Sequence, residues 1–192
     1  MKKLLSSLFL LALCSSLAMA TVPDPSKCSV TPDYNGWCLI APGVIGGTTL
    51  SITVRNSSNN PINNAVVTVS LNAAIAICTT AQHSANTNVA GQCSITLKGG
   101  GCVNAQTPGA ASVVANGIEI KNYDRVKSPD NSHHTASIPS GAVTVADLPY
   151  FADEFKGAQP AGCHDYTNDG ACTVADLPTF GDAFKLGLSC TI

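Results

Sequence analysis

Apolar and polar residues alternate along three stretches in the first half of the chain, which is the pattern of half-buried β-strands. The stretches are LSITVR at 50–55, AVVTVSL at 65–71 and CSITLK at 93–98. A fourth stretch, SVVANGIEI at 112–120, places Asn116-Gly117 between two short apolar runs, and this dipeptide is a strong local signal for a hairpin. Low aromatic content and Gly-rich connections between such strands predict an all-β sandwich of two sheets.

Two segments of this half carry a resemblance to a known domain type. PINNAVVTV at 61–69 and TNVAGQCSI at 87–95 resemble the frame P-x-x-x-A-x-V-x-V followed by T-x-x-x-G of bacterial immunoglobulin-like domains, which occur on surface and secreted proteins. The resemblance implies an immunoglobulin-like sandwich, which we expect over residues 46–123. Because the matching residues form strand pairs and turns, the resemblance implies a fold and no chemistry.

The second half contains a duplicated unit with a helical pattern. When the chain is aligned with itself at a shift of 29 residues, SGAVTVADLPYFADEFK at 140–156 and DGACTVADLPTFGDAFK at 169–185 agree at 12 of 17 positions. In each copy a turn precedes apolar residues spaced as on one helix face, namely Leu148, Phe151 and Phe155, and Leu177, Phe180 and Phe184. Two such faces can cover each other, so we expect a small all-α unit.

The turn of the second copy has the spacing of a calcium-binding loop. A loop of the EF-hand kind uses side-chain oxygens at positions 1, 3 and 5, glycine at 6, a backbone carbonyl at 7, an often water-linked group at 9 and a carboxylate at 12. The predicted ligands are therefore Asp165, Thr167, Asp169, the carbonyl of Ala171, Thr173 and Asp176. An all-oxygen set favours Ca²⁺ over zinc or copper. The alternative is a turn that caps the helix without metal.

The first copy does not keep this loop. Counting back from Asp147 places Ala136 and Ile138 at positions 1 and 3, so every carboxylate but the last is missing. Asp130 and Asn131 are candidates for ligands that an insertion has displaced.

The two loop-helix units, with Asp at position 12 and the pattern D-x-T-x-D-G-x-x-T-x-x-D, resemble a type I dockerin over about residues 128–192. Dockerins are two-repeat calcium modules that bind cohesin domains and mostly join polysaccharide-degrading enzymes to scaffold proteins. The resemblance implies Ca²⁺ at the six positions above and a cohesin-like partner. It also implies recognition through positions 10 and 11, which are Val-Ala in both copies.

The same resemblance bears on three cysteines. Position 8 of such a loop is usually apolar and pairs with its counterpart in the other copy, and here these positions are Cys172 and Val143. This implies that Cys172 is a buried free thiol. Cys163 and Cys190 flank the second copy, so the resemblance implies a disulfide between them that closes this copy.

Charge places a boundary near residue 124. Residues 21–123 contain four basic and three acidic residues, whereas residues 124–192 contain four basic and nine acidic residues. Neither half is basic enough to hold a polyphosphate backbone, so nucleic acid is not an expected partner. The expected organisation is a signal peptide at 1–20, a Pro/Gly-rich segment at 21–45, the sandwich at 46–123, a linker at 124–132 and the dockerin-like pair at 133–192.

The first twenty residues have the layout of a cleaved secretory signal, with two lysines, an apolar run and small residues that end at Ala20. A lipoprotein anchor at Cys14 is the rival interpretation. No later run approaches the ~18 consecutive apolar residues of a spanning helix. We therefore expect a secreted or cell-surface protein whose mature chain has no membrane span.

Eight cysteines follow the signal, and in an exported chain they favour disulfides. Five precede residue 124 and three follow it, so either a bridge crosses between the halves or each half keeps a free thiol. Cys78 with Cys93 or Cys102 is one candidate pair across strands.

These features predict an exported, non-catalytic calcium-binding protein that mediates docking or assembly. Glycoside hydrolysis needs paired carboxylates, and after the signal the first half offers only Asp24, Asp33 and Glu119. Two alternatives remain. The sandwich could bind carbohydrate through Tyr34 and Trp37, or the chain could self-assemble by adding its Pro-rich N-terminal tail to a neighbour's sheet.

Overall fold

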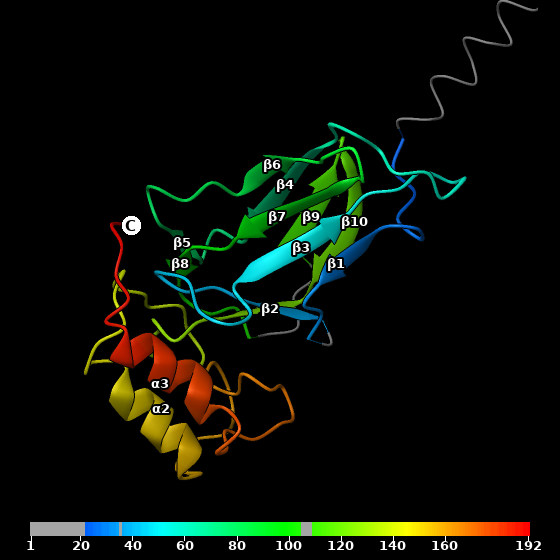
Figure 1. Cartoon of the computed structure of the whole chain (residues 1–192). Helices are drawn as coiled ribbons and strands as arrows, with labels where there is room; N and C mark the ends of the chain where they lie inside the picture. The colour runs from blue at the N-terminus through cyan, green and yellow to red at the C-terminus, as the bar shows by residue number, and fades with distance from the viewer. Residues whose placement is uncertain (1–21, 35, 105–108) are drawn as a thin grey trace, which may run out of the picture.

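A computed structural model describes residues 22–34, 36–104 and 109–192, and the predicted signal segment lies outside them. Two larger β-sheets and two two-stranded sheets form one part of the molecule, and two short helices lie side by side in the other (Figure 1). One sheet has the order β1-β3-β7, with β1 at Ser29–Thr31, β3 at Thr49–Thr53 and β7 at Gln92–Thr96. The other has the order β10-β9-β4-β6, with β4 at Val66–Leu71, β6 at Ser84–Asn86, β9 at Ala111–Ala115 and β10 at Ile118–Tyr123. The expectation of a β-sandwich with a small helical part is confirmed.

The alternating residues of the sandwich fill its core as predicted. Leu50 and Ile52 of β3 are buried, whereas Ser51 between them is exposed. Val67 and Val69 of β4 belong to the same hydrophobic core. Because successive side chains of a strand point to opposite faces, the apolar set of each strand can be buried in one layer.

The predicted hairpin joins β9 to β10. Ile118 pairs with Ala115, so Asn116 and Gly117 form a two-residue loop. Both have positive φ, 46° and 82°, which is the conformation of the hairpin turn that this dipeptide favours.

The predicted linker at 124–132 is wrong, because this segment runs through the folded interior. Arg125–Lys127 form β11, which pairs in parallel with β2 at Trp37–Leu39. Val126 packs in the sandwich core, and Asp130 is fully buried. A linker between independent domains would instead be exposed and make few contacts.

The segment expected to precede the sandwich, 21–45, also contributes strands to the fold. It contains β2, and it contains β1, which pairs with β3 of the same chain. From Ser29 onward, the Pro-rich tail therefore pairs with a strand of the same chain.

The two helices are α2 at Leu148–Phe155 and α3 at Leu177–Lys185. The rings of Phe151 and Phe180 stack between them, with centroids 4.7 Å apart. Both rings belong to a second hydrophobic core, which consists of Trp37, Leu39, Ala41, Ile45, Val143, Phe151, Tyr166, Cys172, Phe180 and Ala183. Because β2 contributes Cys38 to the first core and Trp37 and Leu39 to the second, it joins the helices to the sandwich.

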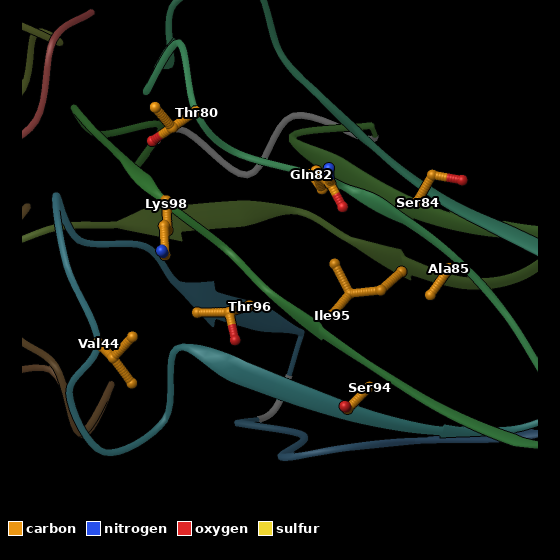
Figure 2. Close-up of a pocket in the computed structure, with 9 residues that line it drawn as sticks. All are labelled: Val44, Thr80, Gln82, Ser84, Ala85, Ser94, Ile95, Thr96 and Lys98. Atoms are coloured by element: carbon orange, nitrogen blue, oxygen red, sulfur yellow. The ribbon is translucent and has the colours of Figure 1, made fainter.

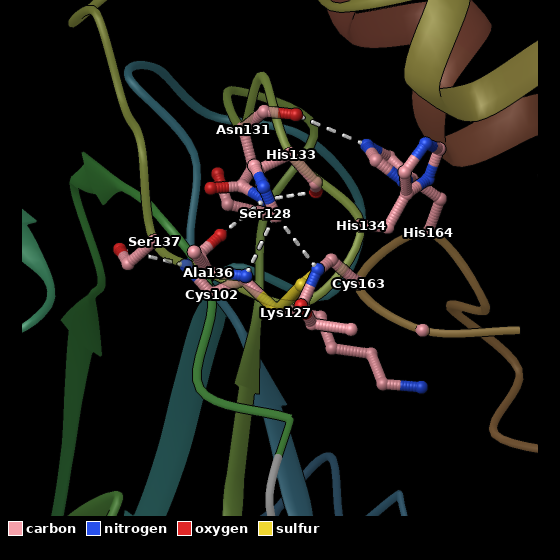
Figure 3. Close-up of a disulfide and its surroundings, with 12 residues drawn as sticks. Cys102, Lys127, Ser128, Asn131, His133, His134, Ala136, Ser137, Cys163 and His164 are labelled. Carbon is pink, nitrogen blue, oxygen red and sulfur yellow. Dashed lines mark hydrogen bonds between the residues drawn. A yellow bond between two sulfur atoms is a disulfide. The ribbon is translucent and has the colours of Figure 1, made fainter.

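Two disulfides further join the halves. Cys78, after β5 at Ala76–Ile77, is bonded to Cys190, and Cys102, after β8 at Gly99–Gly100, is bonded to Cys163 (Figure 3). The expected pairs Cys78 with Cys93 or Cys102, and Cys163 with Cys190, are wrong. The C-terminal segment lies beside Cys78, where Thr79 N–H donates to the carbonyl of Thr191 at 2.8 Å.

The remaining four described cysteines are free, namely Cys28, Cys38, Cys93 and Cys172. Cys172 is buried, as the dockerin resemblance implies. Cys28 and Cys93 flank β3 on either side, and strands two apart in a sheet are separated by about 10 Å, which exceeds the reach of a disulfide.

Candidate calcium loop

The loop of the second copy is organised around Asp165. One carboxylate oxygen accepts the N–H of Asp169 at 3.3 Å and the other accepts the N–H of Gly170 at 3.1 Å. Asn168 and Gly170 have φ values of 57° and 96°, which bend the backbone around this side chain. Glycine and asparagine are the residues that adopt such values at least cost, so the sequence favours this bend locally.

Asp176 closes the loop from the start of α3. It is fully buried, and its two oxygens accept the N–H groups of Thr167 at 2.7 Å and Thr173 at 2.8 Å. The Thr173 hydroxyl accepts the N–H of Ala175 at 3.2 Å. The N–H of Asp176 in turn donates to the backbone carbonyl of Thr173 at 3.1 Å, so Thr173 and Asp176 order the turn before the helix.

The predicted ligands lie in one loop, but their carboxylates do not converge. The Asp169 carboxylate accepts the N–H of Ala171 at 3.0 Å. In the part of the chain that the structure describes, no three His, Cys, Asp or Glu side chains are placed to share a metal ion. The donor set still suits Ca²⁺, because all its atoms are hard oxygens and the backbone bend at position 6 is present. To bind the ion, the carboxylates of Asp169 and Asp176 would have to release the backbone N–H groups that they accept in this structure.

The first copy uses equivalent hydrogen bonds across an insertion, and Asp130, one of the two displaced residues considered from the sequence, takes the place of Asp165. Asp130 accepts the N–H groups of Ser140 and Gly141, each at 2.9 Å, as Asp165 does for Asp169 and Gly170. Asp130 and Ser140 are ten residues apart, whereas Asp165 and Asp169 are four apart. Asp130 therefore takes position 1, and the counting that placed Ala136 there is wrong.

Asp147 closes the first loop as Asp176 closes the second. Its two oxygens accept the Ser132 hydroxyl at 2.9 Å and the Thr144 N–H at 2.8 Å. Asn131 has a different role, because its side chain bonds within the insertion to His133, Ala136 and Ile138. Burial raises the pKa of the Asp130 carboxyl above its ordinary value, although the N–H groups of Ser140 and Gly141 oppose this.

A buried His164–Glu154 pair joins the loops to α2, and sequence reasoning gave it no role. His164 Nδ1 lies 2.8 Å from Glu154 Oε1, and His164 Nε2 lies 3.2 Å from the carbonyl of Asn131. Burial would raise the pKa of Glu154, but the hydrogen bond and charge of His164 outweigh it and hold that pKa below its ordinary 4.5. The repeat could not reveal this pair, since Ala183 stands where Glu154 has its counterpart.

Two cations of β11 also reach the second loop. The Lys127 ammonium donates to the carbonyl of Asp165 and to Asn168 Oδ1, and it lies 3.7 Å from Asp165 Oδ2. The guanidinium of Arg125 donates to the same Asn168 oxygen. Burial lowers the pKa of Lys127, while the charge of Asp165 opposes that change.

The aromatic residues considered for carbohydrate binding do not form an exposed platform. Trp37 is only 1% exposed and packs in the second core, with Tyr34 stacked on it at a centroid distance of 4.5 Å. Carbohydrate platforms need an accessible ring face, so Trp37 cannot serve as one in this arrangement.

A groove of about 410 Å³ lies on the sandwich beside β6 and β7 (Figure 2). Its lining residues are Val44, Thr80, Gln82, Ser84, Ala85, Ser94, Ile95, Thr96 and Lys98. The groove offers hydroxyl groups and one ammonium for binding. None of its lining residues is a carboxylate, so it lacks the acid pair of a glycoside hydrolase.

Several apolar side chains of the two repeat copies remain exposed. The predicted helix faces are only partly buried, because Phe151 and Phe180 meet centrally while their apolar neighbours stay accessible. The exposed residues come in equivalent pairs, Val145 and Val174 at 73% and 74%, Leu148 and Leu177 at 44% and 48%, and Phe155 and Phe184 at 39% each. We call these six residues the paired apolar face.

No protein-family model matches the chain, and no curated protein matches it either. Within the described residues, neither helix has the length and apolar character needed to cross a membrane.

Proposed function

We propose that this chain is an exported, non-catalytic protein whose helical pair binds Ca²⁺ and docks a cohesin-like partner, at the cell surface or in an extracellular complex linked to polysaccharide degradation. The second loop carries the calcium part of the proposal. Its position-1 carboxylate already accepts the N–H groups of positions 5 and 6, and Gly170 supplies the bend. The hard oxygen donors thus lie on an ordered backbone.

The paired apolar face supports the docking part. Val145 and Val174 stand at the recognition position implied by the dockerin resemblance, and both are about three-quarters exposed. The opposite side of the helices is covered by β2 through the second core. Exposed large apolar side chains are a common feature of protein interaction sites.

Calcium titration of the mature protein tests the first part. Isothermal titration should give one binding event with the wild type, and Ca²⁺ should raise Tm because it binds the folded state only. Asp169→Ala should show no heat of calcium binding. Asp182→Ala, which removes a carboxylate on α3 outside the loop, should show the same binding heat as the wild type. Absence of binding by the wild type would refute the calcium proposal.

Docking is tested by affinity capture from the secreted proteins of the same cell, with identification of the captured protein. The double variant Val145→Asp/Val174→Asp should keep the wild-type Tm, since both side chains are exposed, and should lose capture of a cohesin-like protein. Chelation should release that protein from the wild type. Size-exclusion chromatography with and without chelator separates this outcome from self-assembly, in which the chain would associate with itself.

A further inference from the structure

Lys127 gives the second loop a positive charge that comes from the sandwich. It is the last residue of β11, its side chain is 1% exposed, and its ammonium lies 5.4 Å from the centre of the Trp37 ring. An ammonium has three N–H donors and needs acceptors for them when buried. Here the acceptors are the carbonyl of Asp165 and Asn168 Oδ1, and Asp165 Oδ2 adds an ion pair at 3.7 Å, all within the loop.

We propose that Lys127 is a built-in counter-cation of the calcium loop. It balances the Asp165 carboxylate when calcium is absent, and it opposes calcium when the ion binds to the same carboxylates. The inference rests on the proposed calcium binding and adds its regulation: the sandwich, through β11, sets the calcium affinity of the helical pair.

The two loops differ in this respect. Asp130, the counterpart of Asp165, makes no ion pair among the described residues and is held by the N–H groups of Ser140 and Gly141 and by the Ser140 hydroxyl. Asp165 has the same N–H donors and in addition faces an ammonium at 3.7 Å. The hydrogen bonds of the bend therefore do not require the lysine, whose contribution to the second loop is its charge.

The cost and gain of this charge follow from Coulomb's law. Two like charges a few ångströms apart in a partly buried site repel each other, and a divalent ion doubles that interaction relative to a monovalent one. Without calcium the same ammonium attracts the carboxylates, so it should keep the loop folded in chelator. Lys127 is thus expected to weaken calcium binding and to stabilise the calcium-free protein.

Charge-removing variants test this. Lys127→Gln keeps a donor for Asp165 and Asn168, whereas Lys127→Met keeps the length without a donor. Isothermal titration should give calcium affinity about tenfold tighter in both variants. Tm in chelator should fall in both, and saturating calcium should restore most of the loss. Lys121→Gln is the matched control, because Lys121 forms a partly exposed pair with Asp33 on the sandwich and should leave calcium affinity unchanged.

The outcomes separate the two proposals. Calcium affinity that is unchanged or weaker in Lys127→Gln overturns the counter-cation. Failure of the wild type and all variants to bind calcium overturns the proposed function, and this inference with it. If neither Lys127 variant folds, Arg125→Gln removes the neighbouring charge that reaches the same Asn168 oxygen, and unchanged affinity in that variant overturns the proposal as well.

Discussion

At the residue scale, the polar interior is concentrated where the two loops meet α2. Glu154 is 3% exposed and accepts the N–H of Gly162 at 2.7 Å in addition to its contact with His164. Both ring nitrogens of His164 lie within hydrogen-bond distance of oxygen atoms, Nδ1 of the Glu154 carboxylate and Nε2 of the Asn131 carbonyl. The two side chains therefore form a buried, hydrogen-bonded pair.

We expect Glu154→Gln to destabilise the protein by about 3 kcal/mol, because breaking a buried pair leaves the partner charge uncompensated. Urea denaturation at pH 7 measures the change. Asp153→Asn, which alters a neighbouring and more exposed carboxylate, should stay within about 0.5 kcal/mol of the wild type. Equal stability of Glu154→Gln and wild type would show that the pair contributes nothing.

The same pair should contribute to acid sensitivity. The folded-state pKa of Glu154 lies below its ordinary 4.5, so its contribution to stability is present above pH 4.5 and is lost as pH falls through the folded pKa. Stability measured between pH 7 and pH 3 should therefore fall less steeply in Glu154→Gln than in the wild type. Parallel curves would contradict the assignment.

At the element scale, the second copy offers two glycines that differ only in backbone conformation. Gly170 in the loop has a φ of 96°, whereas Gly181 lies within α3, and an added Cβ would meet nothing within 4 Å at either position. Crowding therefore does not decide the effect of a methyl group at these sites.

Gly170→Ala should destabilise by about 1–2 kcal/mol, because alanine resists positive φ. Gly181→Ala should stabilise by about 0.5–1 kcal/mol, because alanine is the better helix former. Thermal unfolding of the two variants measures both effects. Changes of the same sign would show that the loop backbone differs from the one described here.

The sequence predicts those elements whose signal is local and periodic. Leu50 and Ile52 alternate with polar neighbours, and the Asn116-Gly117 dipeptide favours one type of hairpin turn. The strands and the hairpin can therefore be predicted from neighbouring residues. The second loop follows because its oxygens stand at fixed spacings. In each case the information lies within about a dozen residues.

Features that depend on distant residues were not predictable in this way. β11 is only three residues long, and its pairing with β2 joins segments about ninety residues apart. Asp130 occupies position 1 of the first loop across six additional residues, which a count of fixed spacing cannot follow. The odd number of cysteines in each half was compatible with a disulfide between the halves, but it could not identify which cysteines are bonded.

At the scale of the whole molecule, the helical pair and the sandwich are one folded body. β11, the second core and two disulfides connect them, with sequence separations of 112 and 61 residues between the bonded cysteines. The paired apolar face is therefore presented from a fixed position. This differs from a docking module on a flexible linker.

The disulfide pattern predicts how many cysteines are free to react with an alkylating reagent. Alkylation of the denatured, unreduced mature protein should label four cysteines, Cys28, Cys38, Cys93 and Cys172, and peptide mass spectrometry identifies them. Labelling of any of the other four would contradict the connectivity.

Removal of one bridge should lower stability. Cys102→Ser/Cys163→Ser should lose about 2–4 kcal/mol through the greater freedom of its unfolded chain. Cys93→Ser, which alters a free thiol, is the control and should change less. The comparison is made by urea denaturation without reductant.

The bridge between Cys78 and Cys190 also determines how the molecule would bear tension. A force applied between Val22 and Ile192 would pass along the chain to Cys78, cross the bridge and leave through the last residues. While the bridge is intact, this force could not extend the backbone of the 112-residue span that the bridge closes, which contains the helices and both loops. Stretching from its ends would extend the early strands and leave the two loops of the repeat mechanically shielded.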